Sequence, residues 1–345
     1  MRKRRVAPWC LTVLAGTVLC TLSLRAAPKN LRVIQTNSAG DNIHLIDPVT
    51  NTVVGEIDGI EVSHGVSASP DGSRLYVSEE SRNTLDVVDV KTLKVTDRIP
   101  LSGNPNNVSI TPDGRKVYVA IIQKPGAVDV IDTATLKDVK TIPTKGGIHN
   151  LYVTPDGKDV AAGSPRGKTL NVIDTATDTV AWTVDMGMEV RPMAFAKNPD
   201  GSTKWIFVQS TLNGFVVVDF ATHQIIKRIM NPDLPPGYKE VTEGADKSHG
   251  IAVTADGKTL VVNSRLNNFL YMYSLPDLRL KGSAYLGEQG SMGAAWVTLT
   301  PDSQRAYVAM SVTNDVVVVD LKTMKEIACI PVGYVPKRNI TAMLQ

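Results

Sequence analysis

The length of 345 residues would by itself suggest two domains, unless an internal repeat sets the fold. The formal net charge is +3, but the first 26 residues contain five basic residues and no acidic one, so the remaining chain carries −2. This balance excludes a basic surface for nucleic acid. Cys10 and Cys20 also lie in this segment, which leaves Cys329 alone and excludes an internal disulfide.

Residues 1–26 are typical of a secretory signal peptide. A basic start, Arg2-Lys3-Arg4-Arg5, precedes an apolar run over residues 6–24, and Ala26 supplies a small residue near a cleavage point. We therefore expect a cleaved signal, a periplasmic or secreted protein, and no membrane attachment after cleavage. A retained N-terminal anchor is the alternative.

A strand–turn–strand unit over residues 63–77 then sets the pattern for the rest of the chain. Its turn is Pro70-Asp71-Gly72, and alternating apolar residues flank it, as expected for a half-buried β-hairpin. Related turns follow at residues 112, 155, 199, 255 and 301, with spacings of 42, 43, 44, 56 and 46 residues counted from residue 70. A period in the low forties is that of one four-stranded propeller blade.

Counting these units predicts an all-β, seven-bladed β-propeller of four-stranded antiparallel blades over residues 27–345. Residues 31–58 supply only three strands of a blade, and the C-terminal segment supplies the missing one, so the ring closes on itself and loses its exposed edges. The predicted blades are 31–58 with 336–345, 63–101, 105–144, 148–187, 190–230, 248–286 and 293–333.

Several recurring motifs resemble the YVTN family of β-propeller repeats. They are Tyr76-Val77-Ser78-Glu79, its counterparts at residues 118–121 and 307–310, and Val-Ile-Asp-Thr-Ala-Thr at 130–135 and 172–177. The resemblance implies a seven-bladed propeller in an exported microbial protein. It implies no single activity, because related propellers include surface-layer proteins, lactonase-like enzymes and the haem-d1 domain of nitrite reductase.

One long spacing marks an insertion at residues 231–247, where prolines and glycine exclude regular structure. By strand alternation it emerges on the face where the innermost strands begin. The sequence leaves two alternatives open, a lid over the channel mouth and a solvated surface loop.

Three of the five histidines share one register. His64, His149 and His249 each lie six residues before the turn, at the start of the innermost strand, in the second, fourth and sixth blades. Three imidazoles around one axis suit a divalent metal with an open coordination position. The alternatives are a metal-free polar pocket and histidines that only pack between blades.

Other polar residues are expected at the same mouth. Asn106 and Ala295 occupy the same register, with Trp296 beside it, and weaker alignments add two cations suited to an anion, Arg191 and Arg338. Glu61 and Glu189 precede the register and are the candidate catalytic bases. Loops between second and third strands reach this face with Glu79, Glu80, Arg82, Arg166 and the candidate ligand-binding residue Arg265.

These residues predict a ligand-binding pocket for a small anion or a carbohydrate, with a bound divalent metal as an open alternative. With a metal, the enzyme would be a lyase, a lactonase or an oxidase. The competing hypothesis is a non-catalytic scaffold that binds protein or glycan at the cell surface. Covalent c-type haem is excluded, because no Cys-x-x-Cys-His motif occurs. The aspartates that recur at strand ends, Asp89 and Asp132 among them, are expected to cap turns.

Overall fold

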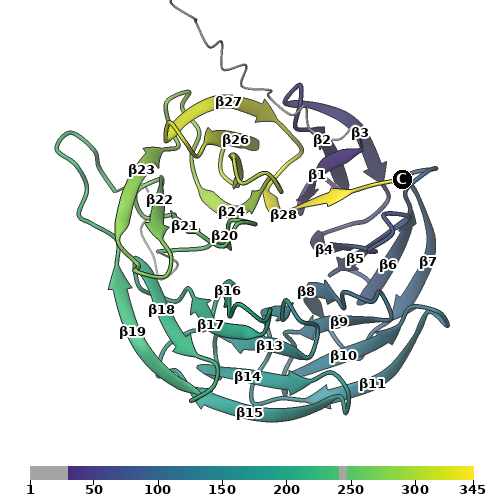
Figure 1. Cartoon of the computed structure of the whole chain (residues 1–345). Helices are drawn as coiled ribbons and strands as arrows, with labels where there is room; N and C mark the ends of the chain where they lie inside the picture. Colours follow the sequence, from purple (N-terminus) through teal and green to yellow (C-terminus); the bar gives the residue numbers. More distant parts are fainter. Residues whose placement is uncertain (1–29, 241–246) are drawn as a thin grey trace, which may run out of the picture.

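The computed structural model describes residues 30–240 and 247–345 and shows seven four-stranded antiparallel sheets arranged around a central axis (Figure 1). The predicted seven-bladed β-propeller is therefore confirmed. The described residues form no helix, and hence none that could cross a membrane. The predicted signal peptide, residues 1–26, lies outside the described residues.

Each sheet is one blade, numbered here in chain order. Blade 1 contains β28 (Pro336–Met343), β1 (Leu31–Asn37), β2 (Asn42–Asp47) and β3 (Thr52–Asp58). Blade 2 contains β4 (Ser63–Ala68), β5 (Arg74–Glu79), β6 (Thr84–Asp89) and β7 (Lys94–Pro100). Blade 3 contains β8 (Pro105–Ile110), β9 (Lys116–Ile121), β10 (Ala127–Asp132) and β11 (Lys137–Pro143).

The remaining blades repeat this order. Blade 4 contains β12 (Asn150–Val153), β13 (Asp159–Ser164), β14 (Thr169–Asp174) and β15 (Thr179–Asp185). Blade 5 contains β16 (Met193–Lys197), β17 (Thr203–Val208), β18 (Gly214–Asp219) and β19 (Gln224–Met230). Blade 6 contains β20 (Ile251–Val253), β21 (Thr259–Ser264), β22 (Phe269–Ser274) and β23 (Leu280–Tyr285). Blade 7 contains β24 (Ala294–Leu299), β25 (Arg305–Met310), β26 (Asp315–Asp320) and β27 (Lys325–Pro331).

The hydrophobic core lies between the blades. In β26, the four consecutive valines at 316–319 are all fully buried, because each face of a blade packs against a neighbour. Outer strands such as β7 instead keep most of their residues exposed. The middle strands are therefore continuous β-branched runs, whereas a sheet with one solvated face would show strict alternation.

The two ends of the described chain close the ring. β1 pairs antiparallel with β28, with Ile34 opposite Ile340, and Leu344 N donates to Asn30 O at 2.9 Å. The C-terminal strand lies beside the earliest strands in Figure 1. This pairing leaves no sheet edge open between the first and last blades, as expected from the sequence.

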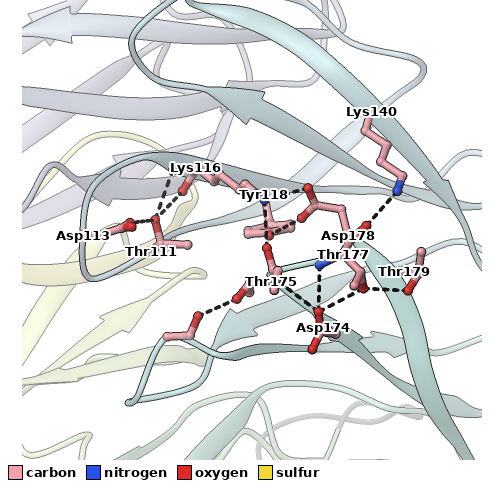
Figure 2. Close-up of polar contacts among 12 residues, drawn as sticks. Thr111, Asp113, Lys116, Tyr118, Lys140, Asp174, Thr175, Thr177, Asp178 and Thr179 are labelled. Carbon is pink, nitrogen blue, oxygen red and sulfur yellow. Dashed lines mark hydrogen bonds and ion pairs between the residues drawn. The ribbon is translucent and has the colours of Figure 1, made fainter.

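Tyrosines of the repeat join neighbouring blades at turns between strands, as Figure 2 shows for Tyr118. Tyr118 OH donates to the Asp178 carboxylate at 2.6 Å, and Lys116 Nζ pairs with the same carboxylate at 2.7 Å. Asp178 lies in the next blade, in the β14–β15 turn. In the equivalent turn of blade 1, Asn51 accepts a hydrogen bond of 2.7 Å from Tyr307 OH. These tyrosines thus hold blades together.

The aspartates at strand ends cap turns, as predicted. Asp174 Oδ1 accepts hydrogen bonds from the backbone and the hydroxyl of Thr177, at 2.8 and 2.9 Å (Figure 2). The same bond from a threonine N–H three residues on recurs at the counterparts Asp89, Asp132, Asp219 and Asp320. Such bonds stabilise the tight turns, and they account for the recurrence of these aspartates in the repeat.

The insertion at 231–247 lies between β19 and β20, and its residues 241–246 are outside the described residues. Its described part contacts blade 6. The Tyr238 ring packs edge-on against Phe269 and Tyr285, with ring centroids 5.0 and 4.9 Å apart, and Tyr273 OH donates to Asn231 Oδ1 at 2.9 Å. The choice between lid and surface loop stays a prediction.

Candidate functional site

The starts of the inner strands bring the three predicted histidines together. The ring centroids of His64 and His149 are 6.1 Å apart, and those of His149 and His249 are 6.0 Å apart. These residues come from blades 2, 4 and 6, which are not neighbours in the ring. Contacts at this distance between alternate blades require that the side chains point toward the central axis.

Each of these imidazoles is held through Nδ1. His64 Nδ1 bonds Glu80 Oε1, His249 Nδ1 lies 2.8 Å from the Ala295 carbonyl oxygen, and His149 Nδ1 lies 2.6 Å from the Asn150 side-chain amide. The Nε2 atoms of these three histidines have no hydrogen-bond partner among the described residues, and each remains accessible to solvent. Each ring is thus held at Nδ1, and its Nε2 atom is available to a ligand.

Burial and nearby cations keep these imidazoles neutral at pH 7. Desolvation lowers the pKa of His149 and His249 well below the ordinary value of 6.5, and the charges of Arg338 and Arg265 add to the effect. The pKa of His64 is also lowered by burial, although its bond to Glu80 opposes the change. Neutral rings can both donate and accept hydrogen bonds.

Arg338 places a buried cation beside these rings. Its side chain is 2% exposed, its Nη2 donates to Asn106 Oδ1 at 2.6 Å, and its guanidinium carbon lies 4.2 Å from the centre of the Trp296 ring. Burial lowers the pKa of Arg338 to about 10, so the group remains charged at pH 7.

Arg338 makes no direct ion pair with a carboxylate of the described residues, although the charge of Glu80, which is already bonded to His64, acts on it from a longer distance. None of the ion pairs among the described residues involves Arg338, and its buried Nε has no hydrogen-bond partner there. Most buried arginines in proteins are paired, because an isolated charge is costly to remove from water. This cation is therefore available to an anionic ligand.

The other predicted acid and base residues are engaged with each other. Glu61 is exposed and bonds Arg82 Nη2 at 2.9 Å, and Glu189 pairs with Arg191 at 2.7 Å. Among the described residues, neither carboxylate bonds a histidine. Arg191 and Glu189 largely neutralise one another, which makes them weaker candidates for binding an anion or accepting a proton. Arg265 lies close enough to His249 to lower its pKa.

Three residues of the site were not among the catalytic or binding residues expected from the sequence. Glu80 was expected only to reach this face, yet it is the carboxylate that holds His64. Asn150 and Tyr152 come from β12. The Asn150 amide lies 3.4 Å from Tyr152 OH, and burial raises the pKa of Tyr152 to about 12. Asn150 and Tyr152 could have been identified from the sequence, because they lie two residues apart on the inner strand that begins directly after His149 and therefore share one face of it.

The structure gives limited support for a metal centre. No three histidine, cysteine, aspartate or glutamate side chains of the described residues are grouped to hold a metal ion. The Arg338 guanidinium also disfavours a cation nearby. The metal prediction for His64, His149 and His249 therefore remains untested.

The fold and the site define a seven-bladed β-propeller with a histidine- and arginine-lined axial site. Residues 26–162 match the family model described as the cytochrome D1 heme domain. This segment includes His64, Asn106 and His149, and the match agrees with the resemblance to YVTN propeller repeats. No curated protein is significantly similar in sequence to this chain.

Solved structures of several propellers are similar in fold. Hydrazine synthase of Kuenenia stuttgartiensis is 22% identical with a TM-score of 0.69, over 83% of this chain and 91% of that chain. The dihydro-heme d1 dehydrogenase NirN in complex with DHE is 17% identical with a TM-score of 0.63, over 92% and 76%. A functionally unknown protein from Desulfotomaculum acetoxidans is 14% identical with a TM-score of 0.73, over 91% and 99%. At these low sequence identities, the TM-scores show a shared fold alone.

Proposed function

We propose that the axial site binds a small organic carboxylate, with Arg338 as its counter-ion. The observation that carries this proposal is a buried guanidinium, 2% exposed, whose Nε has no hydrogen-bond partner and which makes no direct ion pair among the described residues, the nearby Glu80 carboxylate being bonded to His64. Trp296 on β24 of blade 7 and Asn106 on β8 of blade 3 orient the planar group, and a carboxylate matches its donor geometry.

The energetics favour an anion over a neutral ligand. Burying an unpaired charge costs several kcal/mol, of the order of 3–5. A bound carboxylate offsets that cost by pairing with the guanidinium in a low-dielectric environment. The neutral imidazoles next to Arg338 supply hydrogen bonds without adding a competing charge.

The site also contains a candidate proton acceptor. His64 Nε2 is free, and Glu80 at Nδ1 would stabilise the imidazolium that forms when the ring takes a proton. We therefore assign the base role to the His64–Glu80 pair in place of Glu61 and Glu189. The lyase, lactonase and oxidase chemistries stay open, and the fold similarity to a dihydro-heme d1 dehydrogenase supports a ligand-binding propeller without naming the ligand.

Calorimetry and thermal unfolding with matched ligands test the proposal. Acetate, propionate and succinate should raise the unfolding temperature with concentration, because a ligand that binds the folded state stabilises it by mass action. Acetamide and propionamide, which have similar shapes and no charge, should have no effect at the same ionic strength. Equal responses to acids and amides, or no response to either, would favour the scaffold hypothesis.

A divalent metal is the second candidate ligand. It is favoured by His64 and His249, whose Nδ1 atoms bond the Glu80 carboxylate and the Ala295 carbonyl oxygen, the arrangement that second-shell bonds give to metal-binding histidines. Metal analysis of the purified protein should then find about one equivalent of a transition metal. The variant with His64, His149 and His249 all changed to alanine should lose it, and equal metal content in both proteins would remove this candidate.

A further inference from the structure

We infer that the three histidines present a fixed pattern of hydrogen-bonding groups, acceptors at His64 and His249 and a donor at His149, which selects a small carboxylate that also carries a hydroxyl group. This inference rests on the proposed carboxylate site and specifies the substrate class. Its premises are the partners of the three Nδ1 atoms.

His249 has its tautomer set by a backbone carbonyl. The Ala295 oxygen, 2.8 Å from Nδ1, can only accept a hydrogen bond, so Nδ1 carries the proton. In the neutral ring, Nε2 is then an unprotonated acceptor. The His249 ring also packs against Trp296, with centroids 5.6 Å apart, which fixes the direction of Nε2.

His64 has the same tautomer for a different reason. Its Nδ1 partner is the Glu80 carboxylate, which also accepts a 3.3 Å hydrogen bond from Asn106 Nδ2. Burial, the largest single effect, raises the pKa of Glu80, but the hydrogen bond from His64 and the nearby positive charges of Lys337 and Arg338 together lower it, so the carboxylate is ionised and can only accept. His64 therefore donates from Nδ1 and presents Nε2 as an acceptor.

His149 has the opposite tautomer because of Arg338. The Asn150 amide lies between the two, and a guanidinium has only donors. The amide oxygen therefore faces Arg338, 2.9 Å from Nη1 and 3.1 Å from Nη2, and the amide nitrogen faces His149 Nδ1 at 2.6 Å. Nδ1 accepts this bond, and Nε2–H becomes a donor.

A ligand that satisfies these groups needs a donor in addition to its carboxylate. A plain carboxylate has only acceptors, so it would pair with Arg338 and accept from His149 but leave two imidazole acceptors unmatched. A hydroxyl group supplies one donor, which matches one of these two acceptors. An ammonium group would also donate, but the positive charges of Arg338 and Arg265, which lower the pKa of His249, disfavour a second cation.

Nitrogen-15 NMR of the histidine-labelled protein tests the tautomers directly. The chain has five histidines, so single variants assign each signal. His64 and His249 should show protonated Nδ1, and His149 should show protonated Nε2. Protonated Nε2 in His64 or His249, or protonated Nδ1 in His149, would overturn the inference whatever the ligand.

Matched ligand pairs test the selectivity by calorimetry. Glycolate should bind about 10-fold more tightly than acetate, and lactate more tightly than propionate, since one satisfied hydrogen bond contributes roughly 1.4 kcal/mol. Glycine should bind no better than acetate. Equal affinities within each pair would overturn the hydroxyl inference and leave the carboxylate site intact, whereas no binding of any acid would overturn the proposed function itself.

Single histidine variants show which ring is responsible for the preference for glycolate over acetate. In the variant His64→Ala the preference for glycolate over acetate should shrink by about 10-fold, with acetate binding retained. His223→Asn is the matched control, because His223 stacks on Trp182 away from the site and asparagine tolerates its φ of 59°. An unchanged preference in His64→Ala would overturn the role given to His64, and a loss of preference in His223→Asn would show that the effect is not local.

Discussion

Replacing Arg338 by methionine is expected to weaken carboxylate binding by about 100-fold, the effect of removing one partner of a buried charge pair worth roughly 3 kcal/mol. Methionine fills similar space, and it can still pack on Trp296. Methionine, however, lacks the charge of this buried guanidinium, which makes no direct ion pair among the described residues. Calorimetric titration with acetate measures the change, and thermal unfolding checks that the variant folds.

Two further variants separate charge from geometry. Arg338→Lys keeps the charge but loses the planar fork that bonds Asn106 and covers Trp296, so binding should fall by an intermediate factor. Arg191→Met is the matched control, because Arg191 already pairs with Glu189 at 2.7 Å. A smaller loss in Arg338→Met than in Arg191→Met would show that the counter-ion is misassigned.

Acidification from pH 7.5 to 5 is expected to lower the free energy of unfolding through the three axial histidines. Burial lowers their pKa in the folded protein below the ordinary value of 6.5. Between the folded pKa and 6.5, the unfolded chain therefore binds more protons, so stability is lost as the pH falls through this window. Each fully titrating histidine contributes up to about 1.4 kcal/mol per pH unit.

Urea unfolding at several pH values measures this effect. The wild type should lose about 3 kcal/mol more than the variant with all three histidines changed to glutamine, which does not titrate here. The comparison also removes the contribution of other titrating groups, which is the same in both proteins. Among them are Asp138 and Asp159, whose pKa burial raises to about 6 and which therefore stabilise the folded state as the pH falls. Parallel pH profiles for both proteins would contradict the expectation.

The sequence by itself determined the architecture and the shared register of the histidines. Strand patterns, Asp-Gly turns and a period in the low forties are local properties that recur in every blade, so counting them predicts seven sheets and the closure of β1 on β28. The shared register of His64, His149 and His249 likewise placed them at equivalent positions at the start of the inner strand in alternate blades. That their side chains point toward the axis is seen only in the structure.

Only the tertiary structure decided which charged groups serve the site. Glu61 pairs with Arg82 and Glu189 pairs with Arg191, while Glu80 in the β5–β6 loop reaches His64. Arg338 bonds Asn106 across 232 residues of chain, and Trp296 of another blade covers its guanidinium. Such partners depend on loop conformation and on contacts between distant blades. A repeat pattern specifies strands and their register but leaves those contacts unspecified.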